Sequence, residues 1–215
     1  MHRVKKLLST FDVVFWDFDG VVKDSVTVKT EGYEKLFLLY GDEVAGRVID
    51  HHEAHGGVSR YEKIPLYLGW AGEVVTDEKV REFCERFALL VHQAVIDAPW
   101  VGGVREYLQA QHDRQYFVLV TATPQDEIES ILRSLEIDGF FREVHGAPKP
   151  KTTAIGNVLG RLKCSPSQAL MVGDADSDLK AAEANNVPFL LRRTRLNESL
   201  QRRYSGPMFD ELSYE

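Results

Sequence analysis

Two aspartates separated by a single residue are the first groups in this sequence that could do chemistry. Asp17 and Asp19 stand directly after the apolar run 12–16 and are followed by Gly20. A buried strand that ends here presents both carboxylates at its carboxyl end, where open α/β sheets place their ligands. Two like charges this close need a cation, a shared proton or a turn opened by the glycine. The pattern predicts an acid–base or metal site, and its structural alternative is a solvated Asp-Gly turn.

A second acidic segment follows another apolar run, 169–172. Three aspartates alternate there: Asp174, Asp176 and Asp178. A calcium-binding loop alternates in the same way but also requires glycine at its sixth position and glutamate at its twelfth, which here are Leu179 and Asn185. A helix N-cap accounts for one acid and not for three. Carboxylates from separate strand ends that hold a hard cation such as Mg²⁺ fit this segment better.

Two further segments could serve an anionic substrate. Thr121 and Ala122 precede a helix expected to begin near Pro124, where a hydroxyl and backbone N–H groups suit an anionic oxygen. The alternative for Thr121 is a purely structural cap. Lys149 and Lys151 lie in a Gly-Pro turn before another helix, and alone they would be solvated lysines. They matter because a site that gathers carboxylates and a phosphate needs a balancing cation.

The segments that must position these groups alternate between short apolar runs and helical stretches. The expected strands are 12–16, 116–120, 169–172 and 188–191, with 141–144 as a further short strand. Helices are expected after Pro124, near Thr152 and after Ala175. Short runs rich in β-branched and aromatic residues are typical of parallel strands buried on both faces. This alternation predicts an α/β sheet with helices on both faces.

One long stretch departs from the alternation. Residues 26–97 contain no strand-like run, and their apolar side chains recur at helical spacing. We expect a helical subdomain inserted after the first strand, with the sheet resuming at 100–104.

Composition excludes several classes of protein. A net charge of −7 over 215 residues, without a basic run, argues against a nucleic-acid partner. The two cysteines, Cys84 and Cys164, are far apart, so neither a disulfide framework nor a zinc site is expected. The apolar stretch near the N-terminus is broken by polar residues, which is atypical of a signal peptide. No window approaches the roughly 20 apolar residues of a membrane span, so a soluble cytoplasmic protein is expected.

The order of the motifs carries more information than any one of them. Asp-x-Asp, Thr, Lys and Gly-Asp-x-x-x-Asp occur in sequence between residues 12 and 178. This order resembles the haloacid dehalogenase superfamily, subfamily I with a helical cap, of the phosphoglycolate phosphatase and β-phosphoglucomutase type. The resemblance implies a Rossmann-like core formed by residues 1–25 and 98–215, and a helical cap domain formed by 26–97.

The resemblance also implies roles for the two first aspartates. Asp17 would be the nucleophile that forms an aspartyl-phosphate. Asp19 would protonate the leaving oxygen and then deprotonate the hydrolytic water. Mg²⁺ would be held by the Asp17 carboxylate, the Asp19 backbone carbonyl and Asp174, with Asp178 as a water-mediated partner.

Further groups would bind the phosphoryl oxygens and balance their charge. The Thr121 hydroxyl and the Ala122 N–H would bind phosphoryl oxygens. A lysine would neutralise the nucleophile and the phosphate. Members of this superfamily use either a Lys-Pro motif, which selects Lys149, or a Gly-x-Pro-x-x-Lys motif, which selects Lys151. The Gly-Ala-Pro at 146–148 favours Lys151.

The variants of the motifs narrow the reaction. Dehalogenases lack the second carboxylate, which is present here as Asp19. The Lys-Thr-Gly-Thr continuation and the membrane segments of the related transport ATPases are absent from the sequence. We therefore expect a Mg²⁺-dependent phosphatase of a small phosphorylated metabolite. The alternatives are a phosphomutase, which uses the same acids, and a non-catalytic binding protein on the same fold.

The cap would choose the substrate. Gly56-Gly57 is a hinge before a capping-box-like helix start at Ser59, similar to the cap loop of β-phosphoglucomutase-type members. Arg60, and less directly Lys63, could reach a second anionic group of the substrate, and the alternative is a solvated helix start. Three histidines beside Glu53 allow a metal site, although polar contacts at a helix end are the simpler interpretation: His51, His52 and His55. A basic group near the C-terminus is either a solvated face or a contact surface: Arg192, Arg193 and Arg195.

Overall fold

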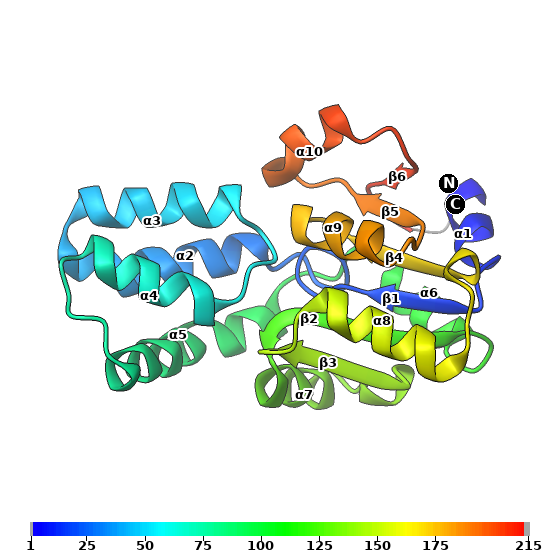
Figure 1. The fold of residues 1–215 in the computed structure, drawn as a ribbon, viewed down its shortest axis with the longest axis horizontal. Coiled ribbons are helices and arrows are strands. Elements are labelled where there is room, and N and C mark those ends of the chain that lie inside the picture. The colour runs from blue at the N-terminus through cyan, green and yellow to red at the C-terminus, as the bar shows by residue number, and fades with distance from the viewer. Residues whose placement is uncertain (1, 213–215) are drawn as a thin grey trace.

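A parallel sheet positions the site. The computed structural model describes residues 2–212, whose six strands lie in the order β3-β2-β1-β4-β5-β6 (Figure 1). Every neighbouring pair in this sheet is parallel. The strands are β1 (Val13–Trp16), β2 (Tyr116–Pro124), β3 (Glu143–Ala147), β4 (Ala169–Gly173), β5 (Phe189–Arg192) and β6 (Met208–Phe209).

The centre of the sheet explains the apolar runs. Strand β1 lies between β2 and β4, and Trp16 pairs with Leu119 on one side and Val172 on the other. All four residues of β1 are buried, because helices cover both faces of the sheet. The strand order reverses at β1, and ligands of open α/β sheets bind at the carboxyl edge beside such a reversal. The segments after β1 and β4 therefore emerge next to each other at this edge.

Helices cover the two faces in two groups. Side chains of α1 (His2–Leu8), α6 (Val104–Gln111) and α7 (Gln125–Ser134) share one buried cluster with one face of the sheet. Side chains of α8 (Lys151–Leu162), α9 (Asp176–Ala184) and α10 (Glu198–Arg203) form a second cluster with the other face. This arrangement confirms the predicted α/β fold with helices on both faces.

Four helices are inserted between β1 and β2 and are called the cap below. They are α2 (Val26–Phe37), α3 (Asp42–Ala54), α4 (Arg60–Trp70) and α5 (Asp77–Asp97). Figure 1 shows them at one end of the sheet, in pale blue to green. Aromatic side chains form the interior of the cap, and Tyr33 contacts Phe87 with ring centroids 4.1 Å apart. The predicted helical insertion is confirmed.

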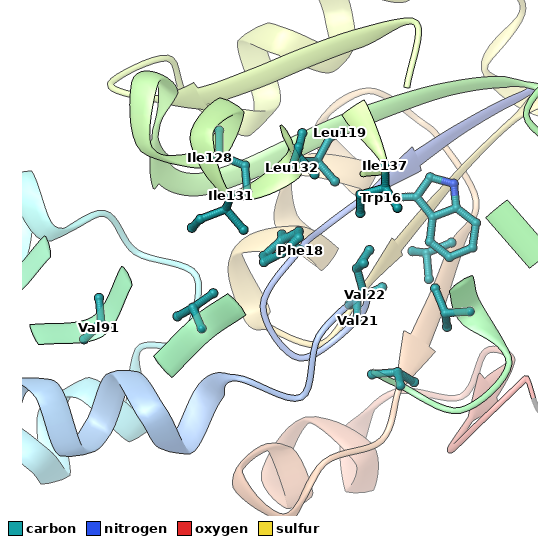
Figure 2. Close-up of a cluster of buried hydrophobic side chains, with 14 of the residues drawn as sticks. Trp16, Phe18, Val21, Val22, Val91, Leu119, Ile128, Ile131, Leu132 and Ile137 are labelled. Atoms are coloured by element: carbon teal, nitrogen blue, oxygen red, sulfur yellow. The ribbon is translucent and has the colours of Figure 1, made fainter. Parts of the chain in front are cut away.

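The cap and one face of the sheet share a continuous apolar cluster. Phe18, in the turn after β1, is fully buried, as are Ile128 of α7 and Val91 of α5. Figure 2 shows Phe18 near Ile131 of α7, with Val91 on the side of the cap. Because α5 also packs against α7, the cap rests on the core through apolar contacts beside the site.

The prediction that the sheet resumes with a strand at 100–104 is wrong. Trp100 forms only an isolated antiparallel bridge with Lys23, and α6 begins at Val104. Gly103 adopts a φ of 75°, which stops extension and begins the helix. The apolar side chains there are buried because the two chain connections to the cap run side by side, with Val101 N–H donating to Val22 O at 3.1 Å. The strand expected at 141–144 is β3 and begins two residues later, at Glu143.

Truncating the centre of the sheet tests the buried core. Phe15 of β1 is fully buried in the cluster with α8 and α9. We expect Phe15→Ala to lower the free energy of unfolding by about 3–5 kcal/mol, because a cavity replaces the ring. Urea unfolding measures this change. Leu89→Ala is the control, since Leu89 is 85% exposed and its loss is expected to change stability by no more than about 0.5 kcal/mol. Equal effects of the two substitutions would contradict the packing described.

Candidate active site

Three buried carboxylates meet at the carboxyl edge of the sheet. Asp17 follows β1, Asp174 follows β4, and Asp178 lies in the first turn of α9. One oxygen from each of the three lies within 4.8 Å of the others. The Asp17 N–H donates to Val172 O at 2.9 Å, which fixes the end of β1 beside β4. The reversal of strand order thus brings together acids that are far apart in sequence.

Lys151 is the cation within this cluster. It is the first residue of α8, and its Nζ lies 2.9 Å from Asp17 Oδ1 and 2.6 Å from Asp178 Oδ1. Lys149 is exposed instead, with its Nζ 3.4 Å from His145 Nδ1. Of the two lysines that the sequence offered, the structure places Lys151 against the acids and Lys149 outside the cluster.

The carboxylate of Asp178 is occupied by hydrogen bonds. Its Oδ2 accepts the N–H groups of Asp174 at 3.2 Å and Ala175 at 3.1 Å, and its Oδ1 accepts from Lys151. The carboxylate of Asp174 has no hydrogen-bond partner among residues 2–212 that would compete for a ligand. It approaches Gly20 so closely that a Cβ there would lie 2.2 Å from Asp174 Oδ2. Asp178 therefore orders the loop, while Asp174 keeps its oxygens available.

The charges of the cluster do not balance. Burial raises the pKa of Asp17, and the carboxylate of Asp178 raises it further. The pKa of Asp174 is raised well above its ordinary value by burial and by Asp17. Burial acts to lower the pKa of Lys151, but the attraction of the Asp17 and Asp178 carboxylates is stronger than this effect and raises the pKa overall. One lysine cannot compensate three carboxylates, and clustered hard oxygen ligands suit a divalent cation, so the residues present fit a metal ion.

Asp19 lies in a separate network beside this cluster. Its carboxylate accepts hydrogen bonds from Ser25 Oγ at 2.7 Å and Thr123 Oγ1 at 3.1 Å, and it pairs with Lys29. Burial acts to raise the pKa of Asp19, but the Lys29 ammonium and these hydrogen bonds lower it overall. Lys29 stands on α2, so a residue of the cap sets the charge state of a candidate acid in the core.

Sequence reasoning did not find Lys29, Ser25 or Thr123. Ser25 and Thr123 stand at the ends of the segments that contain Asp17 and Thr121 but were given no role, and Lys29 resembles any solvated lysine of an amphipathic helix in the printed sequence. Its Nζ also donates to Thr123 Oγ1 at 2.8 Å, 94 positions away in the chain. Only the closure of the cap over the end of β2 brings these groups together.

A small cavity of 60 Å³ lies between the cap and the core. Its core side includes Asp17, Asp19, Asp174, Thr121 and Ala122. Its cap side includes six polar or aromatic side chains: Lys29, Tyr33, His52, Arg60, Lys63 and Phe87. Thr121 is almost fully buried, and its Oγ1 accepts the N–H of Thr123 at 3.2 Å. The cavity is far below the 300–1,000 Å³ or so that holds drug-sized ligands, so the closed site suits only a small molecule.

The double glycine of the cap sits on the rim of this cavity. Gly57 has a φ of +73°, and a Cβ there would lie 2.1 Å from Ser177 Oγ of α9. Ser177 Oγ donates to Gly56 O at 3.4 Å. The segment predicted as a hinge therefore closes onto the first turn of α9, next to the acidic cluster.

Arg60 lines the cavity but already has a partner. It is 5% exposed, and its Nη2 lies 2.7 Å from Glu127 Oε1 on α7. Its guanidinium also lies over the ring of Phe87, 4.6 Å from the centroid. Arg60 begins α4 after Ser59, whose Oγ accepts the N–H of Tyr61. The ion pair with Glu127 ties the cap to the core, so the guanidinium is engaged before any substrate binds.

The other basic groups of interest behave as local contacts. His51 stacks on His55 with ring centroids 4.0 Å apart, and its Nδ1 lies 3.0 Å from Tyr67 Oη. Within residues 2–212 the one group of three possible metal ligands that emerges is the aspartate cluster, and it contains no histidine. Arg192 pairs with Asp24 and Arg193 pairs with Asp210, so these two arginines form ion pairs within the core.

Residues 11–186 match the haloacid dehalogenase-like hydrolase family. The match spans well over half of the chain, and the chain belongs to this family of hydrolases.

Individual relatives agree with this assignment. The chain is 26% identical over 184 residues to a phosphoglycolate phosphatase of Pseudomonas putida, covering 81% of this chain and 66% of the relative. It is 26% identical over 192 residues to a phosphorylated carbohydrates phosphatase of Thermotoga maritima, covering 82% of each. The crystal structure of a β-phosphoglucomutase from Clostridium difficile superposes with a TM-score of 0.72 at 18% identity, over 94% of this chain and 91% of that one. That similarity shows the fold: the core with its cap.

A membrane location finds no support in the helices. Among those within residues 2–212, not one combines the length and apolar character that a membrane span requires. The cytoplasmic location stays a prediction.

The ion pair between Arg60 and Glu127 should stabilise the closed cap. Glu127→Gln leaves a guanidinium that is buried without a counter-charge, so the free energy of unfolding should fall by about 3–5 kcal/mol. Denaturant unfolding measures the change. Glu129→Gln, on the same helix in a more exposed pair with Arg133, is the control and should cost no more than about 1 kcal/mol. If Glu127→Gln were no more destabilising than Glu129→Gln, the pair would not hold the cap.

Removing one carboxylate of the cluster tests the metal site. Asp174→Asn should stabilise the metal-free protein, because a charge that burial and Asp17 disfavour is removed. Mg²⁺ should raise the unfolding temperature of the wild-type protein by mass action, worth about 2.7 kcal/mol at a hundred times the dissociation constant, and should do so much less in Asp174→Asn. Asp176→Asn is the matched control, since Asp176 pairs with Arg203 outside the cluster. Equal stabilisation of both variants by Mg²⁺ would place the ion elsewhere.

Proposed function

We propose that this protein is a Mg²⁺-dependent phosphatase of a small phosphorylated metabolite, acting through an aspartyl-phosphate on Asp17. The observation that carries the proposal is the contact of Asp17 with Lys151 beside the other two acids of the cluster, on the same cavity as Asp19 and Thr121. The family to which the chain belongs and the phosphatases among its relatives support the same reaction.

Asp17 is suited to nucleophilic attack. Its Oδ1 accepts from Lys151 Nζ at 2.9 Å and from the Phe18 N–H at 2.8 Å. These contacts orient the carboxylate and leave Oδ2 to form the bond to phosphorus, while the bond between phosphorus and the leaving oxygen breaks. Thr121 Oγ1 and the Ala122 N–H hold the other phosphoryl oxygens. Positioning and charge compensation of this kind supply most of the rate in phosphoryl transfer.

Asp19 transfers the protons. Its carboxylic acid gives a proton to the leaving oxygen, and the resulting carboxylate then takes a proton from the water that attacks the phosphoryl group. The second step releases inorganic phosphate and restores Asp17. The contact with Lys29 favours the carboxylate, which is the form that the second step requires. The proton taken from the water in that step regenerates the carboxylic acid for the next cycle.

The acidic cluster supplies the metal ligands. Asp17 and Asp174 would hold Mg²⁺ directly, together with the backbone carbonyl of Asp19, and Asp178 would act through water and through the loop that it orders. When bound, the cation neutralises phosphoryl oxygens and the carboxylates around them.

Phosphate release from a panel of phosphorylated metabolites tests the reaction. We expect Mg²⁺-dependent release that falls by about a thousandfold or more in Asp17→Asn, because the nucleophile is lost. Lys151→Met should lose a comparable share, whereas Lys149→Met, outside the cluster, should retain activity. Rearranged ester without free phosphate would favour the phosphomutase, in which a substrate hydroxyl replaces water. Full activity of Asp17→Asn would refute the mechanism, and silence of the wild-type protein on every ester would revive the binding protein.

A further inference from the structure

Lys63 is a buried cation that has no ion-pair partner among residues 2–212, although the carboxylate of its neighbour Glu62 acts to raise its pKa. Its side chain is 1% exposed on α4, and it lines the cavity between cap and core. Among residues 2–212 no carboxylate lies within ion-pair distance of its ammonium. The two other cations that the cap contributes to this cavity each have a carboxylate partner. Lys29 pairs with Asp19, and Arg60 pairs with Glu127. A charge buried in this way is costly unless something pairs with it.

The nearest partner of Lys63 is a neutral histidine. Lys63 Nζ lies 3.0 Å from His52 Nδ1, and burial together with the Lys63 charge lowers the pKa of His52 to about 2. His52 is therefore neutral and accepts one ammonium hydrogen through Nδ1, with its own proton on Nε2. The histidine ring packs against Tyr33 with centroids 4.7 Å apart. This packing fixes the direction of Lys63 and leaves two ammonium hydrogens without an acceptor from the described part of the chain.

The position of Lys63 indicates which part of a ligand would pair with it. The core side of the cavity holds the nucleophile and the phosphoryl-binding groups proposed above, and Lys63 approaches from the cap. A phosphate ester bound to the core side extends its alcohol portion toward the cap. The missing anion is then a group on that alcohol portion.

We propose that Lys63, oriented by His52, binds a negatively charged group on the leaving-group portion of the substrate. The substrate class is a small phosphate monoester whose alcohol carries a carboxylate or a second phosphate. This inference rests on the proposed function for its orientation of the substrate. It assigns the recognition of the second anionic group to Lys63. The sequence suggested Arg60 for that role, but Arg60 instead holds the cap against the core through its ion pair with Glu127.

The test is a binding measurement that needs no catalysis. Phosphonoacetate, which cannot be hydrolysed, carries a carboxylate, and phosphonoacetamide has the same shape without the charge. Titration calorimetry is run with saturating Mg²⁺ at about pH 6.5, below the pKa of about 7 to which burial lowers Lys63, so that the lysine is protonated. The wild-type protein should bind phosphonoacetate about tenfold to a hundredfold more tightly than the amide. Methylenebisphosphonate, in a parallel titration, distinguishes a second phosphate from a carboxylate.

Lys63→Met keeps the length of the side chain and removes its charge. We expect the preference for the charged ligand to fall below about threefold, with the affinity for phosphonoacetamide changed by no more than about threefold. Lys35→Met is the matched control, because Lys35 lies in the same cap and is 65% exposed. Thermal unfolding verifies that Lys63→Met folds, and it should be at least as stable as the wild-type protein, since an uncompensated buried charge is removed.

The outcomes separate this inference from the proposed reaction. A preference that persists in Lys63→Met, or a wild-type protein that binds neither charged ligand, would overturn the role of Lys63 even if phosphate esters are hydrolysed. An equal loss of affinity for charged and uncharged ligands would also overturn it, because Lys63 would then bind the phosphonate itself. A preference that depends on Lys63, in a protein that hydrolyses no ester, would support the anion site and refute the phosphatase.

Discussion

The contact of Lys151 with both Asp17 and Asp178 is the interaction on which the rest of the site depends. It joins the ends of β1, α8 and α9 at the reversal of strand order. Without this ammonium, three carboxylates would be buried with no cation from residues 2–212 in contact with them, which the low dielectric of the interior strongly disfavours. The lysine compensates one charge in full and leaves an excess of negative charge. That excess of negative charge suits the cluster to a divalent cation.

The cap contributes positive charges that pair with carboxylates of the core. Arg60 and Lys29 each reach from the cap to an acid of the core, so two ion pairs hold the cap in its observed position. Glycines 56 and 57 permit the approach, since a side chain at Gly57 would collide with Ser177. The position of the cap also places Lys29 against Asp19, which lowers the pKa of this candidate acid, so the cap and the charge of that acid are linked.

Sequence alone located the elements whose residues are buried on both faces. The runs around 13–16 and 169–172 are continuous and apolar because the sheet is covered twice, and this pattern identified β1 and β4 with little ambiguity. It failed at 100–104, where Val101 and Val104 are buried by chain pairing and a helix start rather than by a strand. Motif spacing pointed to the acids that gather here. It could not reveal Lys29 or Glu127, since their partners stand 10 and 67 positions away and meet only in the folded protein.

The distribution of partners among the cap cations separates two tasks that a cap must perform. A cap cation that pairs with a carboxylate of the core stabilises the contact between cap and core with any ligand, because its partner belongs to the protein itself. A cap cation without a carboxylate partner gains an ion pair only when the ligand carries an anionic group. Its contribution to the binding free energy therefore distinguishes charged from uncharged ligands. Arg60 and Lys29 belong to the first kind and Lys63 to the second. Substrate choice can then change through the residue at 63 and its neighbour His52 while the acids, Lys151 and the closing pairs stay as they are. A shared chemical site beneath a variable cap is what allows one fold to serve many phosphate esters.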